Sequence, residues 1–130
     1  MKIGELHQSG DWKNEKHVPS IDCPDTVKAD EPFEVNVAIG KEIGHPNTTE
    51  HHIRWIRVFF KPDDDKFVYE VGNYAFNAHG ESVEGANKGP VYTEPKVATQ
   101  MKINKKGTIL ATSYCNIHGL WENAATIKVA

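Results

Sequence analysis

The clearest pattern along the chain is an alternation of apolar and polar positions with a period of two. In the stretch FEVNVAI at positions 33–39, every second residue is Phe, Val or Ile, and the residues between them are Glu, Asn and Ala. This period is typical of a β-strand with one buried face. The stretch HHIRWIRVFF at positions 51–60 is rich in β-branched and aromatic residues, so it predicts a central strand.

Shorter apolar stretches, separated by turn-forming residues, predict the rest of the fold. Residues 1–20 have no stable period and predict an irregular arm, whereas Gly and Asn residues predict a loop at 80–90. No helical period persists for more than two turns, so the fold class is all-β. We expect a seven-stranded, immunoglobulin-like antiparallel β-sandwich, with a small barrel or a jelly roll as alternatives. The further strands are predicted at 67–71, 74–78, 99–103, 108–115 and 125–129.

Length and composition restrict the class of protein. A chain of 130 residues, with 38% hydrophobic and 25% charged residues, is expected to form a single domain over 1–130. A net charge of -3, with no Lys/Arg run longer than two residues, argues against nucleic-acid binding. No apolar stretch is long enough to span a membrane and the first residues lack a secretory signal, so we expect a cytoplasmic protein.

The cysteines and histidines give the first indication of chemistry. The chain has two cysteines, Cys23 and Cys115, and a reducing compartment favours a metal or catalytic role for at least one of them. Of its seven histidines, three lie within the octet HPNTTEHH at positions 45–52. Such clustering suggests a loop that supplies metal ligands. Histidines in a solvent-exposed loop without a metal would give the same sequence pattern.

Three short motifs carry candidate ligands. Cys115 and His118 are three positions apart at the end of a predicted strand, where a thiolate and an imidazole can chelate one ion. His45 and His51 flank a segment that can curl around an ion. His52 follows directly, but successive residues at the start of a strand point to opposite faces, so only one of the two can readily be a ligand.

The third motif is EKHVP at positions 15–19, where Glu15, Lys16 and His17 precede a proline. Alone, this motif resembles a series of charged residues on a solvent-exposed surface. The occurrence of all three motifs in one chain is harder to explain by chance. One soft thiolate with several imidazoles suits iron, copper or zinc. Structural zinc prefers four ligands with more than one cysteine. Five ligands would leave one octahedral position open, beside Glu15 and Lys16, for a small molecule at a redox metal.

The motifs EKHVP at 15–19, GHPNTTEHH at 44–52 and YCNIHG at 114–119 together resemble superoxide reductase of the neelaredoxin type. The similarity extends over nearly the whole chain, from SGDW at 9–12 to GLWEN at 119–123. It is specific because the order and the spacing of all three motifs agree. The family's seven-stranded immunoglobulin-like fold agrees with the strands predicted above.

The resemblance implies one iron ion per chain and the reduction of superoxide to hydrogen peroxide. It places four imidazoles in a plane around Fe(II), with the thiolate axial; His118 would bind through Nδ1 and the other three histidines through Nε2. Glu15 is expected to be the sixth ligand in the oxidised state only, and Lys16 to attract the superoxide anion. The implied metal ligands are His17, His45, His51, Cys115 and His118.

The resemblance also implies partners. Only Cys23 precedes the ligand thiol, so no four-cysteine rubredoxin-like module is expected within this sequence, and electrons would come from an external donor such as rubredoxin. Single-domain relatives suggest a homotetramer. We also expect the backbone N–H groups of Ile117 and His118 to hydrogen-bond the Cys115 sulfur and moderate its electron donation. Cys23, His7, His52 and His79 have no assigned role.

Two other classes of protein fit part of the pattern. A blue-copper electron carrier also uses a β-sandwich with an upstream His and a later Cys and His. Its axial Met is missing here, since only Met1 and Met101 occur, and copper would leave His17 and His51 unused. A plain immunoglobulin-like interaction module leaves the three motifs unexplained.

Overall fold

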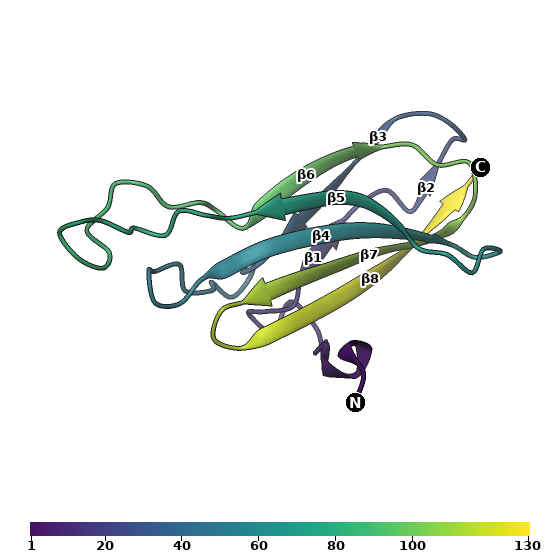
Figure 1. The fold of residues 1–130 in the computed structure, drawn as a ribbon. Coiled ribbons are helices and arrows are strands. Elements are labelled where there is room, and N and C mark those ends of the chain that lie inside the picture. Colours follow the sequence, from purple (N-terminus) through teal and green to yellow (C-terminus); the bar gives the residue numbers. More distant parts are fainter.

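The structure, a computed structural model, describes all of residues 1–130 as two packed β-sheets (Figure 1). A three-stranded sheet has the order β1-β3-β6, and a five-stranded sheet has the order β2-β8-β7-β4-β5. The predicted all-β sandwich is therefore confirmed. The strands are β1 (Ser20–Asp22), β2 (Thr26–Val27), β3 (Phe33–Ala38), β4 (Ile53–Pro62), β5 (Tyr69–Ala75), β6 (Lys96–Met101), β7 (Gly107–Cys115) and β8 (Gly119–Val129).

The core lies between the two sheets and follows the two-residue alternation of the sequence. One cluster of 14 buried side chains includes Val35 and Val37 of β3, Ile56 and Val58 of β4, and Ile109 of β7. These side chains are at most 1% exposed. One core therefore joins both sheets.

The strand predictions need four corrections. Eight strands form instead of seven, because the short β1 and β2 were not predicted and two of the predicted strands are one. One strand, β5, replaces the two predicted at 67–71 and 74–78, since pairing with β4 continues across a bulge between Val58 and Phe59. β8 begins at Gly119, whereas only 125–129 was predicted. The sandwich is also not wholly antiparallel, because β2 pairs with β8 in parallel.

The N-terminal arm is largely irregular, as predicted. Its one helical element is the 3-10 turn η1 (Ile3–Leu6), and Gln8 then forms an isolated parallel bridge with Trp121 of β8. Figure 1 shows η1 beside the end of the sandwich at which β7 turns into β8. No helix of the structure is long and apolar enough to cross a membrane.

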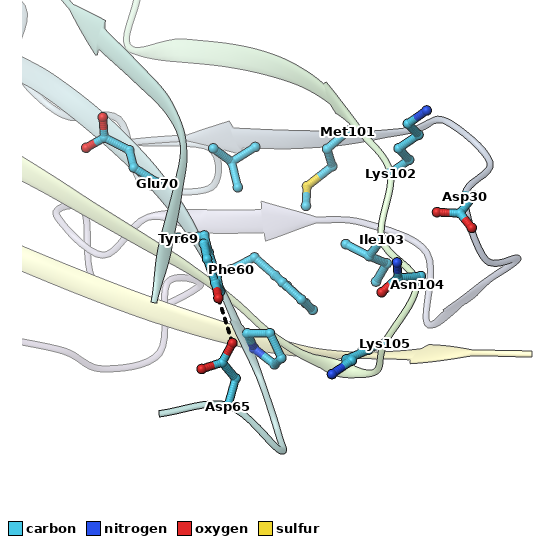
Figure 2. A pocket seen from close by; sticks show the side chains of 12 residues that line it. Asp30, Phe60, Asp65, Tyr69, Glu70, Met101, Lys102, Ile103, Asn104 and Lys105 are labelled. Atoms are coloured by element: carbon cyan, nitrogen blue, oxygen red, sulfur yellow. Dashed lines mark hydrogen bonds between the residues drawn. The ribbon is translucent and has the colours of Figure 1, made fainter. Parts of the chain in front are cut away.

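The largest cavity, of about 550 Å³, lies at the other end of the sandwich. Phe60, Met101 and Ile103 are among its apolar lining residues, and Tyr69 donates a hydrogen bond of 2.6 Å to Asp65 at its rim (Figure 2). None of the predicted ligands lines it. The functional site must therefore be sought elsewhere.

Candidate metal centre

The predicted ligands come from three separate segments that meet at one end of the sandwich. His17 precedes β1, His45 and His51 lie in the loop between β3 and β4, and Cys115 is the last residue of β7. His118 lies in the turn from β7 to β8. Ligand atoms of four of these residues are all within 4.8 Å of one another, namely those of His17, His45, His51 and Cys115.

The turn from β7 to β8 holds Cys115 and His118 close together. Cys115 pairs with Gly119 across the hairpin, and Gly119 has a φ of +84°, a left-handed conformation that favours glycine. The His118 N–H donates a hydrogen bond of 3.4 Å to Cys115 Sγ, and His118 Nδ1 lies 3.9 Å from the same sulfur. The backbone N–H of His118 thus makes the predicted contact with the sulfur. That of Ile117 forms no such hydrogen bond.

Asn116 joins this turn to the His51 loop. Its backbone N–H donates to His52 O at 3.1 Å, its Oδ1 accepts from the His52 N–H at 2.8 Å, and its Nδ2 donates to Glu50 O at 2.8 Å. Glu50 and His52, whose backbone groups form these hydrogen bonds, lie on either side of His51. Asn116 therefore fixes the backbone around His51 relative to Cys115, its own neighbour in the chain.

Four imidazole rings form a closed cycle of contacts at the site. His17 lies beside His45 with ring centroids 4.9 Å apart, His45 beside His51 at 4.8 Å, His51 beside His118 at 5.1 Å, and His118 beside His17 at 4.7 Å. His118 therefore belongs to the same group as the other three histidines. Cys115, which is fully buried, lies at the end of β7, and its ligand atom is within 4.8 Å of those of His17, His45 and His51.

Hydrogen bonds on the outer nitrogens show which ring atoms are available to a metal. Glu15 Oε1 lies 2.7 Å from His17 Nδ1, and Pro46 O lies 2.6 Å from His45 Nδ1. Because a carboxylate and a carbonyl only accept, both Nδ1 atoms carry the proton and both Nε2 atoms keep a lone pair. Histidines that bind metals in proteins are oriented in the same way.

Two of the inner nitrogens have no hydrogen-bond partner, and the other two contact each other. His45 Nε2 and His51 Nε2 are buried and make no hydrogen bond. His17 Nε2 lies only 3.1 Å from His118 Nδ1. Buried acceptors without a partner cost free energy, and one cation among them would satisfy them together. The residues present therefore fit a bound transition metal.

Burial keeps the loop histidines neutral. It lowers the pKa of His45 to about 4, and the nearby positive charges of His17, His51 and Lys16 act in the same direction against a hydrogen bond to Pro46. Burial also lowers the pKa of His51, with a further contribution from His118. Both rings are thus neutral near pH 7, as metal ligands must be.

Glu15 lies on the outer side of His17, with its carboxylate bonded to both the ring and the backbone N–H of that residue at 2.7 Å. Burial alone would raise the pKa of Glu15, but the hydrogen bonds from His17 outweigh it and leave the pKa below its usual value. Glu15 is therefore ionised and fixes the ring proton of His17. It is not among the groups that share the central space.

Lys16 and the exposure of the rings define the open side of the site. Lys16 is partly buried, and its charge is close enough to lower the pKa of both His45 and His51. His17 is 5% exposed, whereas His118 is exposed. A small anion can thus approach the imidazoles from the His118 side, and Lys16 adds a positive charge near His45 and His51.

The remaining histidines and Cys23 lie outside this group. His52 is buried and stacks on His79, with ring centroids 3.4 Å apart and planes at 8°, and its Nδ1 contacts Thr48 O at 2.9 Å. His51 and His52 thus point in different directions, as strand geometry predicts. His7 contacts Ile3 O within the arm, and Cys23 packs against the core as a free thiol.

Sequence reasoning did not identify the residues that support the ligands. In the sequence, Asn116 is only a part of the motif YCNIHG at 114–119, and Trp121 is only a part of the segment GLWEN at 119–123. The one available signal for Asn116 was an amide side chain between two candidate ligands. Trp121 stacks on His17 with ring centroids 4.6 Å apart and planes at 12°, a contact across 104 positions that no local pattern indicates.

Comparisons with known proteins agree with this geometry. A family model described as desulfoferrodoxin matches residues 9–124. The chain is similar to neelaredoxin of Megalodesulfovibrio gigas, at 58% identity over 129 residues that cover 99% of each chain. It is also similar to superoxide reductase of Pyrococcus furiosus, at 55% identity over 126 residues that cover 97% of this chain and 99% of the relative.

Among solved structures, one from Thermotoga maritima is 62% identical and superposes with a TM-score of 0.98, covering 100% of this chain and 98% of the other. Sequence and structure therefore agree over the full length, and the resemblance seen in the three motifs is confirmed. The chain belongs to the desulfoferrodoxin family, among its members of the neelaredoxin type.

Proposed function

We propose that this chain is a superoxide reductase that reduces superoxide to hydrogen peroxide at one iron ion held by His17, His45, His51, His118 and Cys115. The observation that carries the proposal is the convergence of unpartnered imidazole nitrogens on the buried thiol of Cys115. Family membership and the similarity to the Pyrococcus furiosus superoxide reductase support the activity.

The reaction consumes one superoxide anion, one electron and two protons for each hydrogen peroxide released. A ferrous ion bound by the five residues would supply the electron and become ferric. The protein keeps the four imidazoles oriented, places a buried thiol within 4.8 Å of the ligand atoms of three of them, and leaves the His118 side open. Water that reaches this open side can provide the protons.

An external one-electron carrier such as rubredoxin would restore the reduced state. The structure holds one cluster of metal-ligating side chains, and Cys23, the other thiol, is not part of it. Two free cysteines suit a reducing compartment such as the cytoplasm. The assembly proposed for the chain is a homotetramer, as the resemblance of its three motifs implies.

Metal analysis of the purified protein tests the proposal against its alternatives. We expect about one iron per chain; copper would support an electron carrier, and the absence of metal would support an interaction module. The structure argues against the copper site, because Met101 lines the cavity at the far end of the sandwich and Met1 is fully exposed. Neither can be an axial ligand.

Lys16→Ala is expected to slow the reaction with superoxide by about tenfold at low salt and to weaken its dependence on ionic strength. The reason is that Lys16 places a positive charge near His45 and His51, where it lowers the pKa of both rings. Stopped-flow rates at several salt concentrations measure both effects. Lys13→Ala is the matched control, since Lys13 is exposed over the Trp12 ring. An unchanged rate for Lys16→Ala would remove this residue from the mechanism.

Glu15→Ala is expected to keep most of the rate with superoxide, because Glu15 contacts the outer nitrogen of His17 and is not among the groups that share the central space. In our proposal Glu15 binds the oxidised metal, so the absorption spectrum of the ferric protein should change much more than this rate. Glu15→Gln keeps an acceptor for His17 Nδ1 and separates the two roles of the carboxylate. If Glu15→Ala were as inactive as a variant that lacks the thiol, the assigned role would be wrong.

A further inference from the structure

Trp121 contacts two of the proposed ligands at once. Its indole stacks on the His17 ring, with centroids 4.6 Å apart and planes at 12°, and its Nε1–H donates a hydrogen bond of 3.2 Å to His118 O. His17 and His118 lie 101 positions apart in the chain, and their facing nitrogens are 3.1 Å apart. Trp121 is therefore the side chain that joins these two neighbours of the imidazole cycle.

The position of Trp121 is itself well fixed. It lies on β8, pairs with Ser113 on β7 two residues before Cys115, and is 9% exposed. The N-terminal arm covers it, because the Gln8 N–H donates to Leu120 O at 3.0 Å and the Glu122 N–H donates to Gln8 O at 2.8 Å. The indole thus has little freedom to move away from His17.

Trp121 restricts the tilt of the His17 ring plane, which the hydrogen bond from Nδ1 to Glu15 does not fix. The carboxylate of Glu15 fixes the Nδ1 edge of the ring, whereas a stacked indole fixes the plane of the ring. With both in place, His17 Nε2 can point only toward the centre of the site. Neutral aromatic rings in such contact add about 0.5–1.5 kcal/mol beyond their buried area.

His118 is exposed and needs its orientation set through the backbone. Its N–H bonds the Cys115 sulfur at 3.4 Å, and its carbonyl accepts from Trp121 Nε1 at 3.2 Å and from Gln8 Nε2 at 3.0 Å. Trp121 and Gln8 are the only side chains that hold this carbonyl. Together they fix the turn from which the imidazole of His118 projects.

We propose that Trp121 is a positioning residue that holds His17 and His118 in the relative orientation that the metal requires before the metal binds. Gln8 of the N-terminal arm assists it at His118. The inference rests on the ligands assigned above and adds a role for two residues outside that set. Residues that orient metal ligands typically change metal affinity by about 10- to 100-fold when replaced.

Cobalt(II) titration of the metal-free protein, in competition with a chelator, tests this role without any assay of activity. Trp121→Leu removes both the stacking and the N–H donor, so we expect cobalt affinity to fall by about tenfold or more and the d–d absorption bands to shift. Trp121→Phe keeps a stacked ring and Gln8 keeps the carbonyl bonded, so affinity should stay within about threefold. Trp55→Leu is the control, because Trp55 stacks on Tyr114 and on none of the ligand rings.

The double variant Gln8→Ala with Trp121→Phe leaves the core filled but removes both side-chain donors to His118 O. We expect about a tenfold loss of cobalt affinity relative to Trp121→Phe alone. If Trp121→Leu does not fold, this double variant tests whether Trp121 and Gln8 position His118. Wild-type affinity and spectrum in Trp121→Leu, or in the double variant, would overturn the inference. If the wild-type protein bound no cobalt, or bound it unchanged without Cys115, the ligand assignment itself would fail.

Discussion

Replacing Cys115 with serine is expected to lower the rate of superoxide reduction by at least about 100-fold. The thiol is fully buried, lies among the facing nitrogens of the imidazole group and accepts a hydrogen bond from the His118 N–H. Serine keeps a similar shape but offers a hard oxygen in place of a soft, strongly donating sulfur. Even residues that only orient ligands cost about 10- to 100-fold, so loss of the thiolate should cost more.

Two measurements follow the Cys115→Ser variant. The visible absorption band that arises from thiolate-to-iron charge transfer should disappear, and the reaction with superoxide should slow in stopped-flow experiments. Cys23→Ser is the matched control, because Cys23 packs against the core and is not among the clustered ligand residues. A Cys115→Ser protein with the wild-type rate would exclude the thiol from the reaction.

Replacing His51 with asparagine is expected to reduce bound iron from about one per chain to a small fraction, whereas His52→Asn should keep it. His51 Nε2 is buried without a partner beside the other imidazoles, but the His52 ring stacks on His79. The two residues are adjacent in sequence, so the pair separates a ligand role from a general effect on the loop.

Iron content and thermal unfolding should be measured together on this pair. His52→Asn removes a buried contact and should lower the free energy of unfolding by about 1–3 kcal/mol while the metal stays bound. His51→Asn should do the opposite, with little loss of stability in the metal-free protein and a large loss of metal. Loss of iron in His52→Asn with full retention in His51→Asn would show that the wrong histidine was assigned.

Local patterns in the sequence predicted the strands well wherever one face is buried. The alternation at 33–39 and the apolar stretch at 51–60 correspond to β3 and β4. The sequence pattern failed where pairing with another strand determines the bounds of a strand. β5 continues as one strand because its pairing with β4 extends across a bulge. The two-residue β2 forms only because it pairs with β8. Such short strands depend on a partner distant in the chain and leave no period of their own.

The same distinction between local and distant effects applies to the site. Strand geometry explains why only one of His51 and His52 can face the cluster, and the three-residue spacing of Cys115 and His118 explains their shared turn. The stack of Trp121 on His17 and the hydrogen bonds of Asn116 to the His51 loop join segments far apart in the chain. Only the folded structure could reveal these supporting contacts.

The central claim, that the chain reduces superoxide rather than binding metal for another purpose, is tested most directly by the products of one turnover. Iron-loaded, fully reduced protein should be mixed rapidly with a limiting amount of superoxide. Our account predicts one hydrogen peroxide formed and one iron oxidised for each superoxide consumed, without release of oxygen. Unchanged ferrous iron, or half an equivalent each of hydrogen peroxide and oxygen per superoxide, would contradict it.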